Sequence, residues 1–557
     1  MELQAAEVDV VVAGSGAAGM TAALTAAHLG LSVLVIEKAG SFGGSTARSG
    51  GGIWAPGNAV LRNAGVADTA GQARAYLEHV AEGVPAGRRE ALLEHGPEML
   101  GLVLAKTPVR FAWVPGYADY YPEAPGGLAA GRSIEPVPLD GRRVLGAELA
   151  HLARPYLPSP VAITQAEYRW LSLGRHPRGV LAASRVAART IRARLLGQRT
   201  LSLGQALAAG LRAGLMTAGV PVWLDTPLTG LEVTDGRVTG VRATRDGEPV
   251  LIRARRGVLL ATGGFERNEE MRRQYQRAPI GTEWTTGATG NTGDGIRAGL
   301  DLGAATGLMD DAWWGPSILL PGGPYFCLAE RSLPGCILVN GAGQRFVNES
   351  APYVDAVHAM YHGNTPENPH IPAWLVFDQR YRDQYVFAGL PPRKTLPRRW
   401  YAAGAVVRED SLADLAAAAG VDADGLVKTV TRFNEFAAAG SDEDFGRGDS
   451  AYDRYYGDPR LANPNLARLA RPPFYAARIV PGDLGTKGGL CTDEHARVLR
   501  VDGTPIEGLF AAGNASAAVM GHSYAGAGAT IGPAMTFGYI AVHAMAETTA
   551  TPGKTRT

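Results

Sequence analysis

Residues 8–38 read VDVVVAGSGAAGMTAALTAAHLGLSVLVIEK. An apolar strand over 10–13 runs into a glycine turn at 14–19, a helix of small residues follows, and a second apolar strand covers 32–36. Two strands joined through a helix form a βαβ unit, in which the strands lie parallel and the helix begins at the glycine turn. This stretch therefore predicts an α/β fold with a dinucleotide-binding site at the turn.

Three glycines and one acid in this unit have separate tasks. Gly14 permits the tight turn, Gly16 lets the chain approach a pyrophosphate, and Gly19 lets helix and strand pack closely. The free N–H groups at the start of the helix, together with its positive dipole end, favour phosphate oxygens. Glu37 lies 18 residues after Gly19, where a carboxylate can accept hydrogen bonds from the hydroxyls of an adenosine ribose.

Further glycine-rich segments favour FAD over NAD as the dinucleotide. Residues 43–53 read GGSTARSGGGI, and such small residues let an extended pyrophosphate and an isoalloxazine edge lie against the backbone. A second glycine pair follows an apolar strand in VLLATGGFE (258–266), and a third turn occurs in GLFAAGNAS (508–516). Three glycine turns this far apart predict one FAD domain assembled from both ends of the chain.

Composition and charge limit the class of protein further. The chain has 557 residues, of which 46% are hydrophobic, which is enough for a large core and for more than one domain. A net charge of +1 gives no indication of a nucleic-acid or polyanion partner. The three cysteines lack metal-ligand spacing, so we expect no metal site, and they cannot all pair, which suits a reducing compartment.

We expect a cytoplasmic protein. The first strand begins close to Met1, which leaves no room for a signal peptide. No uncharged apolar run reaches the roughly 18 residues that a transmembrane helix needs. The segment TTATPGKTRT (548–557) is expected to be disordered and to carry no chemistry.

Eight segments carry a specific pattern over nearly the whole chain. They read GGSTARSGGGIWAP (43–56), WVPGYADYYPEAPGG (113–127), GDGIRAG (293–299), DDAWWGP (310–316), PYFCLAER (324–331), RFVNES (345–350), PGDLGTKGG (481–489) and GHSYAGAGATIGPAMTFGY (521–539). With these segments the chain resembles the flavoprotein family of fumarate reductases, succinate dehydrogenases and 3-ketosteroid dehydrogenases. Within that family the resemblance is greatest to bacterial 3-ketosteroid Δ1-dehydrogenases.

The resemblance implies a Rossmann-like FAD-binding domain built from both chain ends, with an inserted α+β catalytic capping domain. We place the first part of the FAD domain at 1–280, with a basic amphipathic insertion at about 157–200. The cap is expected at 281–480 and the second part of the FAD domain at 481–557. Helices are expected in the cap over 412–419 and 423–439.

The resemblance also implies which residues surround FAD. Many relatives attach the flavin through a histidine just before the triple-glycine turn, and because Ser45 stands there we expect non-covalent FAD. The expected FAD-binding residues are Gly14, Ser15, Gly16, Ala18, Gly19, Glu37, Lys38, Ser45, Thr46, Gly51, Gly52, Ile53, Leu228, Thr262, Gly263, Asp294, Gly513, Asn514, Ala529 and Ile531.

The activity implied by the resemblance is the conversion of a 3-keto-4-ene steroid to its 1,4-diene, in steroid degradation. The Tyr524 hydroxyl and the Gly528 N–H would bind the ketone oxygen as an oxyanion hole. Tyr325 would remove the proton from C2, and Tyr120 would hydrogen-bond to Tyr325 and ease its ionisation. The hydride from C1 would pass to FAD, which carries the redox chemistry.

Other aromatic residues in the same segments are expected to have structural roles. The family pattern favours Tyr120 over Tyr121, because Tyr120 directly follows Asp119. His522 is interpreted as support for the flavin loop. Residues expected in the wall or core are Trp313, Trp314, Tyr117 and Phe326.

Three alternative functions stay open. Fumarate and succinate enzymes hold two carboxylates with arginines, whereas 521–539 contains no arginine or lysine, which suits a neutral ketone better. This observation opposes a fumarate-reductase-like enzyme. The nearest alternative is a 3-ketosteroid Δ4-(5α)-dehydrogenase, and another is a flavin-bearing binding or electron-transfer module without substrate turnover.

A basic helix is expected within 165–200. This stretch has one acid, Glu167, and eight arginines, which are Arg169, Arg175, Arg178, Arg185, Arg189, Arg192, Arg194 and Arg199. The helical pattern places an apolar face (Leu181, Ala188, Ile191 and Leu195) apart from an arginine face (Arg185, Arg189 and Arg192).

Two interpretations of this helix stay open. In the first, the helix contacts the anionic inner face of the cell membrane, where a lipophilic steroid partitions and where a quinone is a candidate electron acceptor. Alternatively, it docks on the FAD domain by its apolar face. The sequence does not indicate the physiological acceptor, the preferred steroid side chain at C17 or the oligomeric state.

Overall fold

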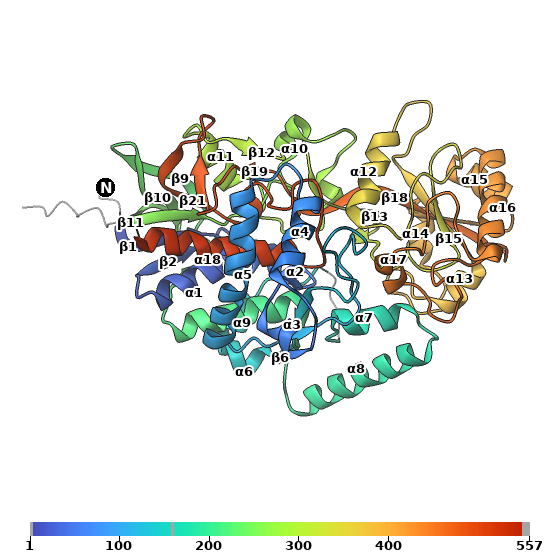
Figure 1. Ribbon diagram of the computed structural model, residues 1–557, viewed down its shortest axis with the longest axis horizontal. Helices are drawn as coiled ribbons and strands as arrows, with labels where there is room; N and C mark the ends of the chain where they lie inside the picture. The colour runs from blue at the N-terminus through green and yellow to red at the C-terminus, as the bar shows by residue number, and fades with distance from the viewer. Residues whose placement is uncertain (1–3, 157–160, 548–557) are drawn as a thin grey trace, which may run out of the picture.

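The computed structural model describes residues 4–156 and 161–547. Two sheets lie side by side, one toward the left and one toward the right of Figure 1. The beginning of the predicted insertion, at 157–160, and the predicted disordered tail, at 548–557, lie outside the described residues.

The first sheet is built from strands that are far apart in the sequence. Its order is β20 (Arg497–Leu499), β21 (Pro505–Ala511), β11 (Glu248–Leu260), β1 (Gln4–Ala13), β2 (Val33–Ile36) and β8 (Val222–Trp223), with a hairpin of β9 (Leu228–Thr234) and β10 (Arg237–Arg245) on β11. β1 pairs in parallel with β2 and β11, and β11 pairs in parallel with β21. The prediction that both chain ends build one α/β domain is therefore confirmed.

The central strands of this sheet end at the same level. Ala13 is in register with Ile36 and with Leu260, and Leu260 is in register with Ala511. Because these strands are parallel, the turns that follow them meet at the carboxyl edge of the sheet, where ligands bind in open α/β folds. The three glycine turns thus come together although they are separated in the sequence.

Helices rich in small residues pack against this sheet. α1 (Ala17–His28) is buried from Ala17 to Ala26, and α18 (Ile531–Glu547) packs against it, as the blue and red helices of Figure 1 show. A β-carbon at Gly538 would lie 2.5 Å from the carbonyl oxygen of Ala18, so a larger residue would separate the two helices. α9 (Leu203–Thr217) and α5 (Ala86–Lys106) complete this layer.

The second sheet is antiparallel and lies within the predicted cap. Its order is β14 (Gly323–Phe326), β13 (Ala312–Leu320), β18 (Phe474–Thr486), β16 (Ala373–Asp378) and β15 (Cys336–Val339), with β17 (Val406–Glu409) also on β18. α15 (Leu412–Ala419) and α16 (Ala423–Ala439) cover one face and begin and end at the predicted residues. The limits at 281 and 480 stay a prediction, and β18 runs through position 480.

Shorter elements connect the two sheets and carry much of the site. β3 (Ile53–Trp54), β5 (Ser133–Pro136) and β4 (Phe111–Trp113) form a small sheet, and the loop that contains Tyr120 joins β4 to β5. Other elements used below are α2 (Gly44–Arg48), α11 (Asp294–Leu300), α12 (Tyr353–Gly363), α13 (Gln379–Gln384) and α17 (Ala451–Tyr455).

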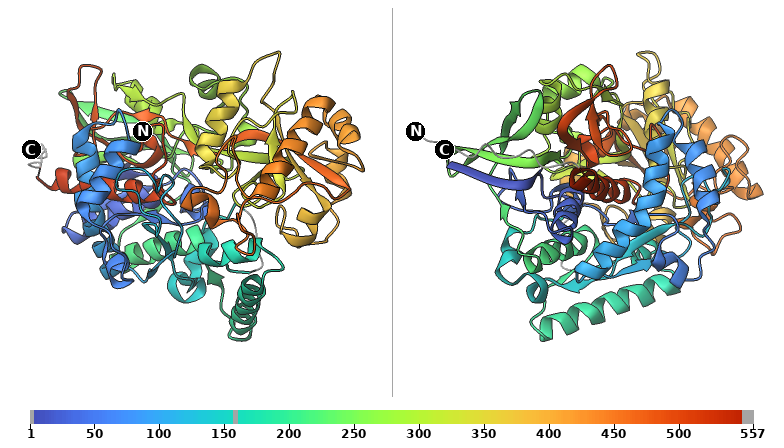
Figure 2. Two further views of the ribbon diagram at one scale, coloured as in Figure 1. Left: turned by 45° about the vertical axis from the view of Figure 1, so that its right-hand side comes forward. Right: turned by 60° about the vertical axis from the view of Figure 1, so that its left-hand side comes forward.

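The predicted basic insertion forms two helices, α7 (Gln165–Ser172) and α8 (Pro177–Leu195). α8 packs on α7, runs along the lower edge of the molecule in Figure 1 and projects from it in the left view of Figure 2. Its buried residues are Gly179, Ala182, Val186 and Ala193. A β-carbon at Gly179 would lie 2.6 Å from the carbonyl oxygen of Trp170, so small residues on this face let the two helices approach closely.

The interpretation in which α8 docks by its predicted apolar face is therefore wrong. Leu181, Ala188, Ile191 and Leu195 are exposed, and Leu195 is 82% exposed. The predicted arginine face is also divided, because Arg189 turns inward and pairs with Glu167 at 2.7 Å. Among the helices of the described ranges, none is both long enough and apolar enough to cross a membrane.

Candidate active site

The first glycine turn has the geometry that the sequence predicts. Gly14 has a φ of 111°, and a β-carbon there would lie 2.2 Å from the carbonyl oxygen of Ala261. A β-carbon at Gly19 would lie 1.9 Å from the carbonyl oxygen of Gly14, so helix and strand pack closely there. A β-carbon at Gly16 would lie 3.7 Å from its nearest neighbour, the Thr46 Oγ1, so the Gly16 backbone is open to a ligand.

The carboxylate of Glu37 stands at the end of β2, as expected for a ribose ligand. Its Oε2 accepts hydrogen bonds from the Ser15 N–H (3.0 Å) and the Ser15 hydroxyl (2.6 Å), and its Oε1 accepts one from the Ala39 N–H. A carboxylate oxygen can accept two hydrogen bonds, so these contacts fix the group and leave capacity for a hydroxyl. Lys38 and Asp294, also expected near FAD, form a salt bridge of 2.8 Å.

The small-residue segment after β2 joins this turn to the C-terminal part of the chain. The Thr46 hydroxyl accepts a hydrogen bond from the Ala17 N–H, at the start of α1, and the Ser45 hydroxyl accepts one from the Asn291 side chain. A β-carbon at Gly528 would lie 2.5 Å from the backbone of Gly52 and of Ile53. The flavin-loop residues therefore lie directly against Gly528.

The remaining expected FAD residues occupy the same edge of the first sheet. A β-carbon at Gly513 would lie 3.5 Å from that of Ala18, which brings the first and third turns together. The Asn514 Oδ1 accepts a hydrogen bond from Trp313 Nε1, at 3.1 Å. The others are Gly51, Thr262 and Gly263 in loops, Leu228 at the start of β9, Ala529 just before α18, and Ile531 at its first residue.

These residues fit FAD. The Thr262 Oγ1 is buried and has no hydrogen-bond partner among the described residues, as expected of a hydroxyl that a ligand satisfies. The open backbone at Gly16 and the fixed carboxylate of Glu37 suit a pyrophosphate and a ribose respectively. The groups predicted from three distant glycine turns thus come together with the surroundings that a dinucleotide requires.

Next to Gly528 lies a cluster of tyrosines from three parts of the chain. The rings of Tyr120 and Tyr524 stack with centroids 5.1 Å apart, and Tyr353, the first residue of α12, packs edge-on against both. The Tyr120 hydroxyl donates a hydrogen bond of 2.9 Å to the Tyr353 hydroxyl. Burial raises the pKa of each of the three phenols.

The expected hydrogen bond between Tyr120 and Tyr325 is wrong. The Tyr120 hydroxyl donates to Tyr353, and the Tyr325 hydroxyl donates to the Glu330 Oε1 at 2.5 Å. Tyr325 and Phe326 are consecutive in β14 and therefore point to opposite faces of the strand. Phe326 packs against Tyr353 at 5.1 Å, so Tyr325 points to the other face, toward Glu330.

Sequence reasoning missed Tyr353. Both Tyr325 and Tyr353 directly follow a proline, and the resemblance was carried by a segment that ends at Ser350, three positions before Tyr353. A signal was available, because Pro352 caps a new helix and places the next side chain at a sharp change of direction. Tyr121, the alternative to Tyr120, donates instead to Asp355 at 2.9 Å.

The two groups expected at the ketone oxygen lie in one loop. The Tyr524 hydroxyl bonds to the Thr530 Oγ1 at 2.8 Å. Among the described residues, none accepts a hydrogen bond from the Gly528 N–H, which is therefore available to a ligand. Tyr524 is 4% exposed, so a carbonyl beside it would be shielded from water.

A buried ionic network supports this loop. The Lys487 Nζ donates to the Ser523 carbonyl at 2.9 Å and to the Asp311 Oδ2 at 3.1 Å, and His522 contacts the same carboxylate oxygen at 3.2 Å. Burial alone would raise the pKa of Asp311, but Lys487, His358 and His522 together hold it well below its usual range. His522 therefore lies where a supporting residue of the flavin loop is expected.

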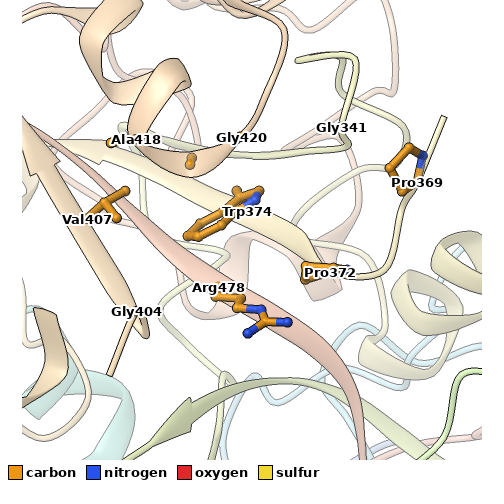
Figure 3. Close-up of a pocket in the computed structure, with 10 residues that line it drawn as sticks. Gly341, Pro369, Pro372, Trp374, Gly404, Val407, Ala418, Gly420 and Arg478 are labelled. Carbon is orange, nitrogen blue, oxygen red and sulfur yellow. The ribbon is translucent and has the colours of Figure 1, made fainter. Parts of the chain in front are cut away.

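The aromatic residues predicted as wall or core are packed as expected. Trp313, Trp314 and Tyr117 are buried in the core that also holds the tyrosine cluster, and Phe326 packs against it. A surface hollow of about 400 Å³ lies elsewhere, and Figure 3 shows Trp374, Val407 and Arg478 in its wall. Trp374 belongs to the core on the α15–α16 face, and the hollow contains none of the predicted site residues.

Comparison with known proteins agrees with this site. The family model described as "FAD binding domain" matches residues 9–531. The chain is 58% identical to the 3-oxosteroid 1-dehydrogenase of Mycobacterium tuberculosis (strain ATCC 25618 / H37Rv), over 96% of this chain and 97% of that protein. It is 55% identical to the 3-oxosteroid 1-dehydrogenase of Mycolicibacterium smegmatis, over 98% and 99% of the two chains.

A solved structure agrees as well. The 3-ketosteroid Δ1-dehydrogenase of Sterolibacterium denitrificans, in complex with 1,4-androstadiene-3,17-dione, superposes with a TM-score of 0.92 at 42% identity and covers 97% of this chain and 100% of its own. The cofactor is FAD. The chain belongs to the family of FAD-dependent 3-oxosteroid 1-dehydrogenases.

Proposed function

We propose that the protein converts 3-keto-4-ene steroids into 3-keto-1,4-dienes. The observation that supports this most strongly is the arrangement of hydroxyls. Tyr120, which is hydrogen-bonded to Tyr353, stacks on Tyr524 beside the Gly528 N–H, which has no partner among the described residues. One side of the cluster can bind a carbonyl oxygen while the other holds a base. The same 521–539 segment contains no arginine or lysine that would favour a dicarboxylate substrate.

The reaction begins at the ketone. The Tyr524 hydroxyl and the Gly528 N–H donate hydrogen bonds to the C3 oxygen, which draws electron density from the ring and makes the C2 proton acidic. The phenolate oxygen of Tyr353 takes this proton, and the electron pair of the broken C–H bond moves into the enolate. Bound FAD supplies the acceptor for the hydride from C1, and loss of that hydride leaves a C1–C2 double bond and a restored ketone.

In this proposal the base is Tyr353 and no longer Tyr325. A phenol has a pKa of about 10 in water, and burial raises the pKa of Tyr353 further. The hydrogen bond from Tyr120 works against this rise, because a donated hydrogen bond stabilises the phenolate more than the phenol. Tyr120 thus keeps the helper role expected of it, with a different partner.

We propose that FAD is held without a covalent bond, since the hydroxyl of Ser45 is engaged with Ala288 and Asn291. The proposed setting is the cytoplasm, with a quinone as the electron acceptor. Reoxidation of the reduced flavin, on mixing the reduced enzyme with a soluble menaquinone analogue, would support this acceptor.

We further propose that α8 contacts the inner face of the cell membrane. Leu181, Ile191 and Leu195 form an exposed apolar stripe on the side of α8 that faces away from α7. Arg178, Arg185 and Arg192 recur every seven residues along one flank of that stripe, and all three are exposed. An apolar stripe bordered by arginines is typical of a helix that lies in an anionic membrane interface.

Sedimentation with liposomes tests this contact. The protein is expected to pellet with phosphatidylglycerol-containing liposomes at low salt, and the variant L181S/I191S/L195S is expected to remain in the supernatant because it lacks the apolar stripe. V501S is the matched control, since Val501 is 85% exposed but lies in a turn of the FAD domain. Failure of the unaltered protein to pellet would contradict the proposal.

The activity itself is tested by mixing the purified yellow protein with androst-4-ene-3,17-dione without oxygen. We expect bleaching of the visible flavin band and formation of the 1,4-diene. If the flavin stays oxidised with this steroid but bleaches with a 5α-reduced 3-ketosteroid, the reaction would be Δ4 desaturation. No response to either steroid would contradict the proposed activity.

A further inference from the structure

Arg331 holds the chain that leads into Tyr353. It lies in the segment that joins β14 to β15, and it is 2% exposed. The Nη1 donates hydrogen bonds to the carbonyl oxygens of Glu349 (2.5 Å) and Ala351 (2.6 Å), and the Nε donates to that of Cys327 (3.3 Å). Ala351 lies two residues before Tyr353, so this guanidinium fixes the entry of the chain into α12.

The charge of Arg331 is not balanced by a carboxylate. Within the described ranges, it forms no salt bridge, and its buried Nη2 has no hydrogen-bond partner. Arg345 and Arg447, the other buried arginines of this region, share the carboxylates of Glu349 and Asp442. Of these three guanidinium groups, Arg331 is therefore the one without a paired carboxylate among the described residues.

The neighbouring carboxyl groups are bonded to partners other than Arg331. Burial raises the pKa of Glu330, whose carboxyl faces Tyr325 and the Ala388 N–H instead of Arg331. Burial likewise raises the pKa of Asp355, which accepts a hydrogen bond from Tyr121, and of Asp453, which accepts from Asn348 and the Gly448 N–H. An uncompensated cation is costly in a protein interior, so its retention needs a reason.

The positive charge acts on the tyrosines around the proposed base. Burial raises the pKa of Tyr452 well above its ordinary value, and Arg331 opposes this rise. The Tyr452 ring lies 4.7 Å from that of Tyr120, the hydrogen-bond donor of Tyr353. The ionisable groups that face Tyr353 are the phenols Tyr117, Tyr120, Tyr452 and Tyr524. The charge of Arg331 also opposes the rise that burial causes in the pKa of Cys327, Asp355 and Asp453.

We propose that Arg331 is a positioning residue for proton abstraction from C2: it orients Tyr353 through the Ala351 carbonyl and supplies the positive charge that balances the Tyr353 phenolate. The phenols that surround Tyr353 are neutral and cannot supply this charge. Lys487, a second buried cation near the site, is already paired with Asp311. This inference rests on the proposed function, in which Tyr353 is the base.

The pH dependence of flavin reduction separates this role from a structural one. The reductive rate is measured without oxygen at saturating androst-4-ene-3,17-dione, from about pH 6 to pH 10, the range in which a helped phenol ionises. The rate should rise with pH as Tyr353 loses its proton. Because a nearby cation lowers the pKa of a phenol, R331Q should move this rise to higher pH by about 1 unit and lower the rate near neutral pH about tenfold.

Two further variants show whether charge or packing matters. R331K keeps the charge, but its single ammonium group cannot replace the separate Nε and Nη1 donors that bond the carbonyls of Cys327, Glu349 and Ala351. Its rate should therefore fall while its pH midpoint stays at the wild-type value. R382Q is the matched control, because Arg382 is also buried and, within the part of the chain that the structure describes, also donates only to carbonyls, those of Tyr385, Pro391 and Lys394. Flavin content and thermal unfolding are recorded for each variant.

The outcomes are distinct. A wild-type midpoint in folded, flavin-loaded R331Q would overturn the proposal. If R331Q does not fold, R331K alone decides, since a shifted midpoint in R331K would show that the charge is not the cause. A shift of the same size in R382Q would also overturn it. Failure of the wild-type enzyme to reduce its flavin with the steroid would instead contradict the proposed function.

Discussion

Replacement of Tyr353 by phenylalanine should lower the rate of flavin reduction by about 10³-fold, within the range usual for loss of a general base. The phenylalanine keeps the ring that packs against Tyr120, Phe326 and Tyr524, so the site should keep its shape. FAD content and steroid affinity are therefore expected to stay close to wild type. Stopped-flow reduction by androst-4-ene-3,17-dione measures the rate, and exchange of the C2 proton with deuterated water measures the abstraction step directly.

Y325F is the matched control for Y353F. Tyr325 is also a buried tyrosine that follows a proline, and its hydroxyl is also hydrogen-bonded, but to Glu330 on the other face of β14. Its removal should change the rate of flavin reduction by less than about threefold, although it leaves the buried Glu330 with fewer partners and so lowers stability by about 1–3 kcal/mol. A 10³-fold loss in Y325F with normal exchange in Y353F would return the base to Tyr325.

The FAD site could be predicted from sequence because its signals are local. The expected roles of Gly14, Gly19 and Glu37 all lie within one βαβ unit, and the structure gives each of these residues the expected surroundings. The sheet register that brings Gly513 to Ala18 is not local, yet it follows from the rule that turns after parallel strands share one edge. Apolar strands followed by glycine turns were therefore sufficient evidence for the domain.

The proposed base could not be predicted in the same way. Tyr325 and Tyr353 have similar local sequences, and only the pairing of β14 with β13 decides which face of the strand Tyr325 occupies. The predicted docking face of α8 was wrong for a related reason. Periodicity identified an apolar face correctly, but the buried face of α8 consists of Gly179, Ala182, Val186 and Ala193, since close approach of two helices outweighs the burial of leucine there.

Replacement of Tyr524 by phenylalanine should lower the rate of flavin reduction by 10²–10³-fold, the effect typical of removing one oxyanion-hole donor, or about 2.7–4 kcal/mol. Stacking on Tyr120 and the contact with Trp313 use the ring and not the hydroxyl, so packing should be retained. The Gly528 N–H remains as the second donor, which explains why the loss is not complete. Y121F is the control, because it removes another tyrosine hydroxyl of the same region, one that is bonded to Asp355.

A spectral measurement separates the role of Tyr524 from that of Tyr353. A hydrogen bond to the C3 oxygen shifts the ultraviolet band of a bound 3-keto-4-ene to longer wavelength, because it stabilises the polarised form of the enone. This shift should be lost or reduced in Y524F and kept in Y353F, while deuterium exchange at C2 should be slowed in both. If Y524F kept the full shift, the Tyr524 hydroxyl would not be the donor to the ketone oxygen.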